Sequence, residues 1–271
     1  MESQRSKLTY MTICSLTKKN SYRKFWFFAA IFLIFSHDFT AYGFEIEKNP
    51  GVPIEKNFIV GPAKVELEVS SGASKTVTLF VENRTGRDEI FEISFEDFSA
   101  SQVEGETVKL LGNEKSKTSL KDSFFVEKKN FKLSHGDRLL LPVVVTVPGG
   151  ASSGGKFGSV VVSATVAGNR VTQSSQAYTA TTVLGRVATL FFVTVPGKNL
   201  SQGELISLKT KNEKKVFSES EIPFRLEYRN TGNVSLNPYG FVEVKNIWGK
   251  VVAREALDPW YALPDSVRTR D

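Results

Sequence analysis

The feature that most constrains the fold is an alternation of apolar and polar residues between Lys75 and Phe98. Residues Asn83 to Gly86 interrupt it with a turn-forming sequence, Asn-Arg-Thr-Gly. The alternating apolar residues are Val77, Leu79, Val81, Phe91, Ile93 and Phe95. Successive side chains of a β-strand point to opposite faces, so each half predicts a strand with one buried face and one solvated face. Two such runs around a turn predict an antiparallel pair.

The same pattern recurs near the other end of the chain. An alternating run, Phe224 to Tyr228, precedes the turn Asn230-Thr231-Gly232-Asn233, and Phe241 to Val244 resumes it. Further strands are predicted at 65–69, 139–147, 160–164 and 181–195. Pro142 lies inside one of them and predicts an edge position or a bulge, because proline has no N–H to donate to a neighbouring strand. The sequence therefore predicts an all-β protein: two immunoglobulin-like antiparallel β-sandwiches in tandem, the second incomplete, after an N-terminal signal helix.

The expected domain organisation follows from this pattern. Residues 1–43 form a signal peptide and 44–57 an extended lead-in. The first sandwich spans 58–196 and carries a polar insertion with one short strand at 99–122, residues 197–203 form a hinge, and 204–271 form the second sandwich. Too few strands are predicted in 204–271 for a whole sandwich, which takes about seven. We therefore expect this domain to be partial, and completed beyond Asp271 or by packing against the first sandwich or a partner.

The N-terminal segment has the three parts of a secretory signal peptide. Basic residues between Lys18 and Lys24 precede an unbroken apolar run, Phe25 to Phe35, and Ala41-Tyr42-Gly43 provides small residues for cleavage. The run is shorter than the ~20 residues that span a bilayer, so we expect export to the cell surface or periplasm. Contact with the membrane is expected only through this segment or through a C-terminal anchor absent from the sequence.

Charge and cysteine content exclude several functions. The formal charge is +6, but residues 1–43 hold six basic and two acidic residues, leaving 29 basic and 27 acidic residues for the remainder. A nearly balanced mature chain lacks the clustered charge that nucleic-acid binding requires, so no nucleic-acid partner is expected. The only cysteine, Cys14, lies in the leader, which excludes disulfides and thiolate metal sites from the mature chain.

The remaining polar groups favour binding over catalysis. His135 and Asp137 share one predicted turn, where a catalytic relay with a serine is not expected. Glu92 and Glu96 share the predicted solvated face of one strand, and such pairs of carboxylates occur in any charged β-strand. No loop has the spacing of a calcium site. We therefore predict no catalytic residue, no cofactor and no metal.

Aromatic residues near the end of the chain provide the one weak candidate for a binding surface. Trp260 and Tyr261 are neighbours in sequence, and aromatic side chains serve sugar stacking and protein interfaces. Trp248, beside Ile247, is expected to join a core instead. The sequence thus proposes Trp260 and Tyr261 as a binding surface, without identifying a ligand.

Several motifs resemble those of WxL-type bacterial surface proteins, over about residues 55–271. The matching segments are 72–83, 91–98, 133–136, 143–148, 155–162, 228–233 and 246–250. In that family a peptidoglycan-binding sandwich precedes a host-binding sandwich, and a transmembrane helix and a basic tail usually follow. The resemblance implies peptidoglycan and host ligands, but it assigns no binding residue in this chain.

Two functions remain open at this point. The first is a non-catalytic binding or adhesion module of the cell envelope, with cell-wall polymer or another surface protein as its partner. The alternative is a periplasmic chaperone or assembly factor for surface subunits, because pilus chaperones are also two-sandwich proteins that donate a strand. A carbohydrate-active enzyme would require two carboxylates facing one cleft.

Overall fold

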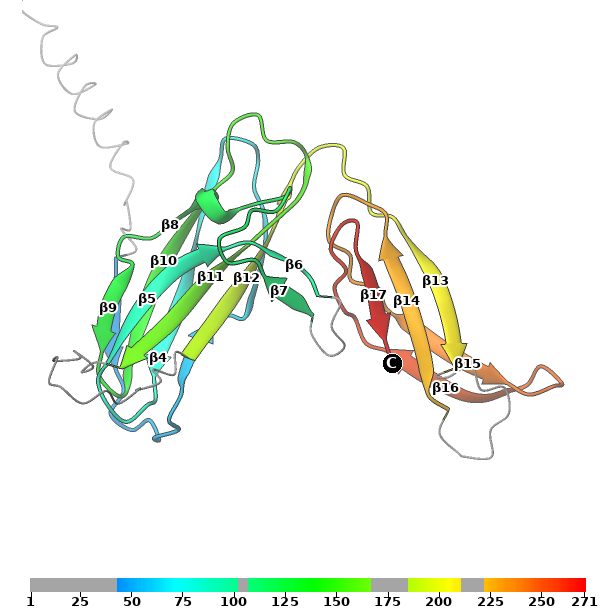
Figure 1. The fold of residues 1–271 in the computed structure, drawn as a ribbon, viewed down its shortest axis with the longest axis horizontal. Helices are drawn as coiled ribbons and strands as arrows, with labels where there is room; N and C mark the ends of the chain where they lie inside the picture. Colours follow the sequence, from blue (N-terminus) through cyan, green and yellow to red (C-terminus); the bar gives the residue numbers. More distant parts are fainter. Residues whose placement is uncertain (1–42, 102–106, 167–184, 211–221) are drawn as a thin grey trace, which may run out of the picture. The chain divides into compact units, whose positions relative to one another are not determined.

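The computed structural model describes residues 43–101, 107–166, 185–210 and 222–271 (Figure 1). They form an all-β protein with two immunoglobulin-like β-sandwich domains and a single 3₁₀ turn. The expected signal helix lies outside the described residues. Within these ranges no helix has the length and apolar character needed to span a membrane.

We call strands β1 to β12 the first module and strands β13 to β17 the second module. The first module comprises β1 (Glu45–Lys48), β2 (Phe58–Gly61), β3 (Lys64–Glu68), β4 (Ser74–Asn83), β5 (Glu89–Glu96), β6 (Phe98–Ala100), β7 (Val108–Leu110), η1 (Lys121–Ser123), β8 (Phe124–Phe125), β9 (Asn130–Leu133), β10 (Asp137–Thr146), β11 (Gly154–Val166) and β12 (Gly185–Val195). The second comprises β13 (Gly203–Thr210), β14 (Phe224–Asn230), β15 (Gly240–Lys245), β16 (Val251–Leu257) and β17 (Val267–Arg270).

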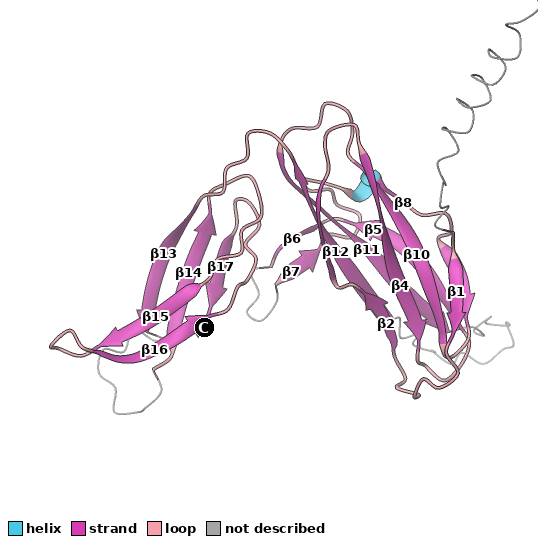
Figure 2. Cartoon of the chain, turned by 180° about the vertical axis from the view of Figure 1, so that it is seen from behind, coloured by secondary structure: helices cyan, strands magenta, loops and turns pink. Residues whose placement is uncertain are grey.

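Two five-stranded sheets form the body of the first module, and β6 and β7 form a separate two-stranded sheet. One has the order β1-β10-β4-β2, with β8 also paired to β10, and the other has the order β3-β12-β11-β5-β9. Figure 2 shows β10, β4 and β2 side by side. The consecutive strands β2 and β3 join different sheets, because β2 pairs antiparallel with β4 whereas β3 pairs parallel with β12. The predicted lead-in also contributes a strand, since β1 pairs with β10.

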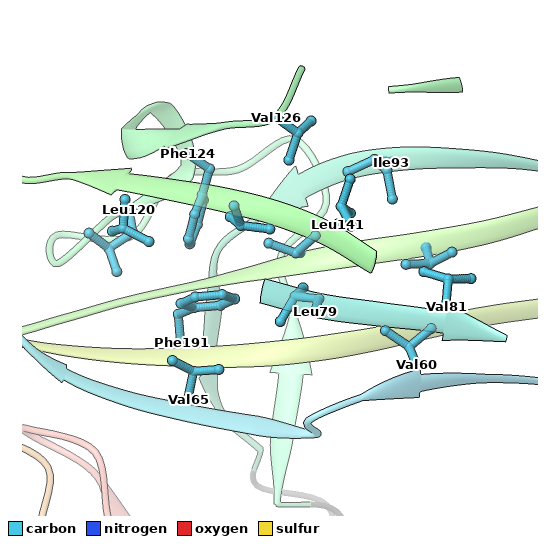
Figure 3. Packing of buried hydrophobic residues seen from close by; sticks show 14 of the residues in the cluster. Val60, Val65, Leu79, Val81, Ile93, Leu120, Phe124, Val126, Leu141 and Phe191 are labelled. Carbon is cyan, nitrogen blue, oxygen red and sulfur yellow. The ribbon is translucent and has the colours of Figure 1, made fainter. Parts of the chain in front are cut away.

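The predicted alternation is confirmed in β4 and β5. Phe91 and Ile93 are 0% and 2% exposed, Leu79 and Val81 are fully buried, and Phe95 packs against the core they form. Figure 3 shows Leu79, Leu141 and Phe191 between the two sheets. Burying one such side chain fully stabilises the fold by about 1.5–3 kcal/mol, so the inner faces of the two sheets hold this module together.

Pro142 occupies a position that suits a residue without an N–H. It lies opposite Thr78 of β4 in the middle of β10. On the other side of β10, β1 pairs with residues 137–140 and β8 with residues 144 and 145. Pro142 therefore falls between two short neighbours on that side. The sequence predicted an edge or a bulge, and the position is a local edge.

The second module has little buried apolar surface. Its sheets have the orders β13-β14-β17 and β15-β16. Among the described residues after Gly197, the buried apolar residues are Leu226, Val234, Ala262 and Leu263. By contrast, 11 of the 15 exposed large apolar residues lie there: Leu200, Leu205, Ile206, Leu208, Tyr239, Phe241, Ile247, Trp248, Val251, Val252 and Val267.

Candidate functional site

Trp260 and Tyr261 are both half-buried and packed against other side chains. The Trp260 ring lies 6.4 Å from the Tyr228 ring in an edge-to-face arrangement, and the Arg270 guanidinium lies 5.2 Å from its centre. The Tyr261 ring lies 5.1 Å from Phe192 of β12, with Lys64 Nζ 5.0 Å from its centre. Burial raises the pKa of the Tyr261 phenol, while the Arg268 charge opposes that rise. Their role as a binding surface stays a prediction.

The most exposed aromatic residues lie elsewhere in the second module. Trp248 is 83% exposed in the turn between β15 and β16, and Tyr239 is 80% exposed just before β15. The expectation that Trp248 joins a core is wrong. Asn246 Oδ1 accepts hydrogen bonds from the N–H groups of Trp248 and Lys250 in a tight turn, and the Trp248 side chain is left exposed there. The apolar neighbour Ile247 does not indicate in the sequence that Trp248 is exposed.

His135 connects two loops of the first module. The Gly86 N–H donates to His135 Nδ1 at 3.3 Å, so the ring proton of the neutral imidazole lies on Nε2. Nε2 is 3.1 Å from the carbonyl oxygen of Val52, which accepts a hydrogen bond from it. Both ring nitrogens are therefore occupied by backbone groups, as expected for a turn residue.

Glu96 and Asp97 are buried at the end of β5 and organise the loop that follows β7. The Asp97 carboxylate accepts the backbone N–H groups of Ser116, Leu120 and Lys121 at 2.9–3.1 Å. Glu96 accepts the Gly112 N–H and pairs with Arg186 of β12. The predicted solvated strand face is wrong for Glu96, because this loop covers it. In the described ranges, no group of three or more His, Cys, Asp or Glu side chains is arranged to hold a metal.

A groove of about 1160 Å³ lies beside β6 and β17. Two of its basic side chains, Arg225 and Arg268, already have partners. Arg225 forms a two-point ion pair with Asp271 at 2.8 and 2.9 Å, and Arg268 Nη1 donates to the carbonyl oxygen of Thr107 at 2.8 Å. Burial lowers the pKa of Arg268. The groove thus has polar walls in which the charges of Arg225 and Arg268 are used to hold structure.

Strand β12 has a partly open edge. It pairs with β11 from Gly185 to Val195, but with β3 only from Leu190 to Thr194. The described residues supply no strand partner to residues 185–188 on the β3 side. An unpaired edge of this kind is a template for adding another strand. Among the described features of the first module, this edge is the strongest candidate for recognition of a polypeptide.

The comparisons with known proteins give a likeness of fold. No family model and no curated protein match the chain. The class 5 fimbriae chaperone CfaA is 15% identical, with a TM-score of 0.42, over 78% of this chain and 84% of that chain. The E. coli chaperone DraB is 16% identical, with a TM-score of 0.40, over 79% and 84%. A CsuC–CsuE chaperone–tip adhesion subunit complex of Acinetobacter baumannii is 11% identical, with a TM-score of 0.41, over 79% and 86%.

The resemblance to WxL-type surface proteins is wrong as a family assignment. No family model matches, and the solved structures named above are pilus chaperones. The motifs that suggested it, such as Tyr228 to Asn233, are strand-turn-strand features that many sandwiches can use. The solved structures of CfaA and DraB are described as those of chaperones. At these identities the likeness concerns the β-sandwich fold alone.

Proposed function

We propose that this chain is an exported, non-catalytic assembly factor of the cell envelope that binds extended segments of surface subunits. The carrying observation is the unpaired edge of β12 at residues 185–188, where β11 is the one strand partner among the described residues. Strand addition to such an edge uses main-chain hydrogen bonds for affinity and alternate side chains for specificity. Periplasmic residence is the corresponding location, reached through the predicted signal peptide.

The side chains around this edge suit a polypeptide partner. Arg186 is tied to Glu96, so its charge is neutralised within the sheet. Val187 and Ala188 are half-buried and follow one another along the strand. An added strand would therefore meet a weakly polar edge and not a charged one. One of the similar solved structures is of a pilin with its chaperone; for this chain, a subunit partner is part of the proposal.

Binding of cell-wall polymer remains the competing prediction. Sugars are bound by exposed aromatic rings with nearby hydrogen-bonding groups. The side chains of Tyr239 and Trp248 are exposed enough for a sugar ring to stack on them. No contact among the described residues brings the two rings together with hydrogen-bonding groups around a site the size of a sugar. We therefore favour the subunit partner, which requires only the free main-chain groups of β12.

Site-directed crosslinking in the intact cell envelope tests this function. Because Cys14 is the only cysteine, Ala188→Cys can carry a thiol-linked photocrosslinker on the open edge. Glu92→Cys is the matched control, since Glu92 is exposed on β5, which has β11 and β9 on its two sides. We expect crosslinks to a surface subunit from position 188 and not from position 92. Equal crosslinking, no crosslinked subunit, or retention of the chain on purified cell wall would contradict the proposal.

A further inference from the structure

The turn that joins β15 to β16 has two large apolar side chains at its corners. The Asn246 N–H donates to the carbonyl oxygen of Lys250, and the Gly249 N–H to that of Asn246, both at 2.9 Å. Asn246 Oδ1 accepts the N–H groups of Trp248 and Lys250, both at 3.0 Å. Gly249 has a φ of 78°, in the left-handed region that favours glycine. The two corner residues between Asn246 and Gly249 are Ile247 and Trp248.

This turn does not require apolar residues at its corners. Its hydrogen bonds lie between residues 246 and 250, with Asn246 as the side-chain acceptor and Gly249 at the left-handed position. Turns favour Gly, Asn, Asp, Ser and Pro. Ile247 and Trp248 are 89% and 83% exposed, more than any other large apolar residue in the described part of the chain. The local fold therefore gives no reason for two large apolar side chains here.

Ile247 and Trp248 lie at the free end of the hairpin. Figures 1 and 2 show the turn between β15 and β16 beyond the ends of β13, β14 and β17. A convex tip has no concave wall that could enclose a small ligand or a sugar ring. Asn246 Oδ1 is already used inside the turn. The tip therefore suits a surface into which its side chains can insert.

The charge beside this tip is positive. Residues 244–253 contain Lys245 and Lys250 and no aspartate or glutamate. Both lysines are exposed. The preceding acidic residue, Glu243, is shared between Lys245 and Arg254, at 3.8 Å from each. Basic side chains next to an apolar tip attract anionic lipid headgroups, and tryptophan favours the boundary between headgroups and acyl chains.

From this turn we infer that the second module contacts the surface of a bilayer that contains anionic phospholipids. Ile247 and Trp248 insert at the level of the headgroups, and Lys245 and Lys250 lie against the phosphates. The contact is shallow and reversible, because two side chains bury far less apolar area than a membrane-spanning segment does. It differs from the contacts predicted from the sequence, which use the leader or a C-terminal anchor. It is also independent of the β12 edge.

The fluorescence of Trp248 tests the insertion. Trp248 and Trp260 are the only tryptophans after the leader, so Trp260→Phe leaves one reporter in the mature chain. We expect vesicles that contain phosphatidylglycerol to shift its emission to shorter wavelength and to reduce its quenching by acrylamide. Vesicles of phosphatidylcholine alone should give a smaller shift, and added salt should reduce the difference between the two. An unchanged emission with both kinds of vesicle overturns the inference.

Co-sedimentation with the same vesicles identifies the residues responsible. We expect I247S/W248S to weaken binding at least about tenfold. K245S/K250S should weaken binding to the phosphatidylglycerol vesicles and remove the difference between the two lipid mixtures. The matched control is Y239S, because Tyr239 is 80% exposed in the same module but about 20 Å from the tip along β15. Equal urea midpoints confirm that the variants fold.

The outcomes separate a membrane from other occupants. Binding that requires phosphatidylglycerol, is lost in I247S/W248S and is kept in Y239S supports the inference. Absence of vesicle binding, or equal loss in both variants, overturns it. Retention on purified cell wall that depends on Trp248, without vesicle binding, also overturns it, since a polymer is then the occupant. Position 188 takes no part in these measurements, so their failure is distinguishable from a failure of the proposed function.

Discussion

Asn83 and Asn230 form the same hydrogen bonds at the same place in two successive β-sandwich modules. Each side-chain amide connects the end of its own strand to the turn that follows it and to the segment before the next turn. A single side chain therefore holds three segments together. Both residues are fully buried. A buried donor or acceptor left without a partner costs about 1–3 kcal/mol, which explains why the same chemistry recurs in both modules.

We expect Asn83→Ala and Asn230→Ala to lower the free energy of unfolding by about 2–4 kcal/mol, because each removes two buried hydrogen bonds donated by Nδ2 and one accepted by Oδ1. Urea unfolding checks this. Trp248 and Trp260 are the only tryptophans after the leader, so their fluorescence reports the second module, and circular dichroism reports both. Asn57→Ala, at an exposed site bonded to Glu55, is the control and should change the value by less than about 0.5 kcal/mol.

Phe91 is expected to contribute more than any exposed aromatic residue. It is fully buried, with ring centres 5.3 Å from Phe58 and 5.7 Å from Phe131. Phe91→Ala should destabilise the first module by about 3–5 kcal/mol through lost burial and a cavity. Phe125→Ala, at a site 64% exposed, should cost far less. Similar urea midpoints for the two variants would show that Phe91 is not a core residue.

A comparison of alanine substitutions at Gly136 and Gly150 distinguishes the cost of backbone strain from the cost of steric overlap. Both have φ of 81°, a conformation that costs an L-residue about 1–2 kcal/mol. A Cβ at Gly136 would lie 2.4 Å from the Asn49 carbonyl oxygen, whereas one at Gly150 has nothing within 4 Å. Gly136→Ala should therefore lower the melting temperature clearly more than Gly150→Ala. Equal shifts would mean that the Asn49 segment moves away freely.

Asp97 is expected to protect the loop between Gly112 and Lys121 from proteolysis. Its carboxylate accepts three backbone N–H groups, and an amide in its place replaces one of the two accepting oxygens with an NH2 group that cannot accept. Asp97→Asn should increase the rate of tryptic cleavage in this loop by about tenfold, because local opening that costs about 1.4 kcal/mol less is tenfold more populated. The exposed Asp122, paired with Lys115, provides the control: Asp122→Asn should leave the rate nearly unchanged. Mass spectrometry of timed digests distinguishes the two.

Local patterns predicted much of the fold. The period-two alternation identified the buried faces of β4 and β5, and the two Asn-containing turns marked a repeated strand-turn-strand unit. Which face of a strand is buried depends on the order of neighbouring residues, so it can be predicted from the sequence. The family assignment failed because those same turns are local solutions shared by unrelated sandwiches.

The candidate sites could not be predicted in the same way. Glu96 reads as a solvated residue of its strand, but a loop from 16 residues further along covers it. The sequence predicts that Trp248 is a core residue, but in the structure its side chain is exposed in a turn. Each outcome depends on segments that are not neighbours in sequence.

By itself, the sequence determined the alternation of the strands, the turns between them and the absence of cysteine chemistry after the leader. Only the tertiary structure decided which strands are neighbours, and hence that part of the β12 edge and the β15 edge stay unpaired among the described residues. The physical reason is that alternation specifies which face of a strand is buried, whereas its neighbours depend on how all the faces pack together.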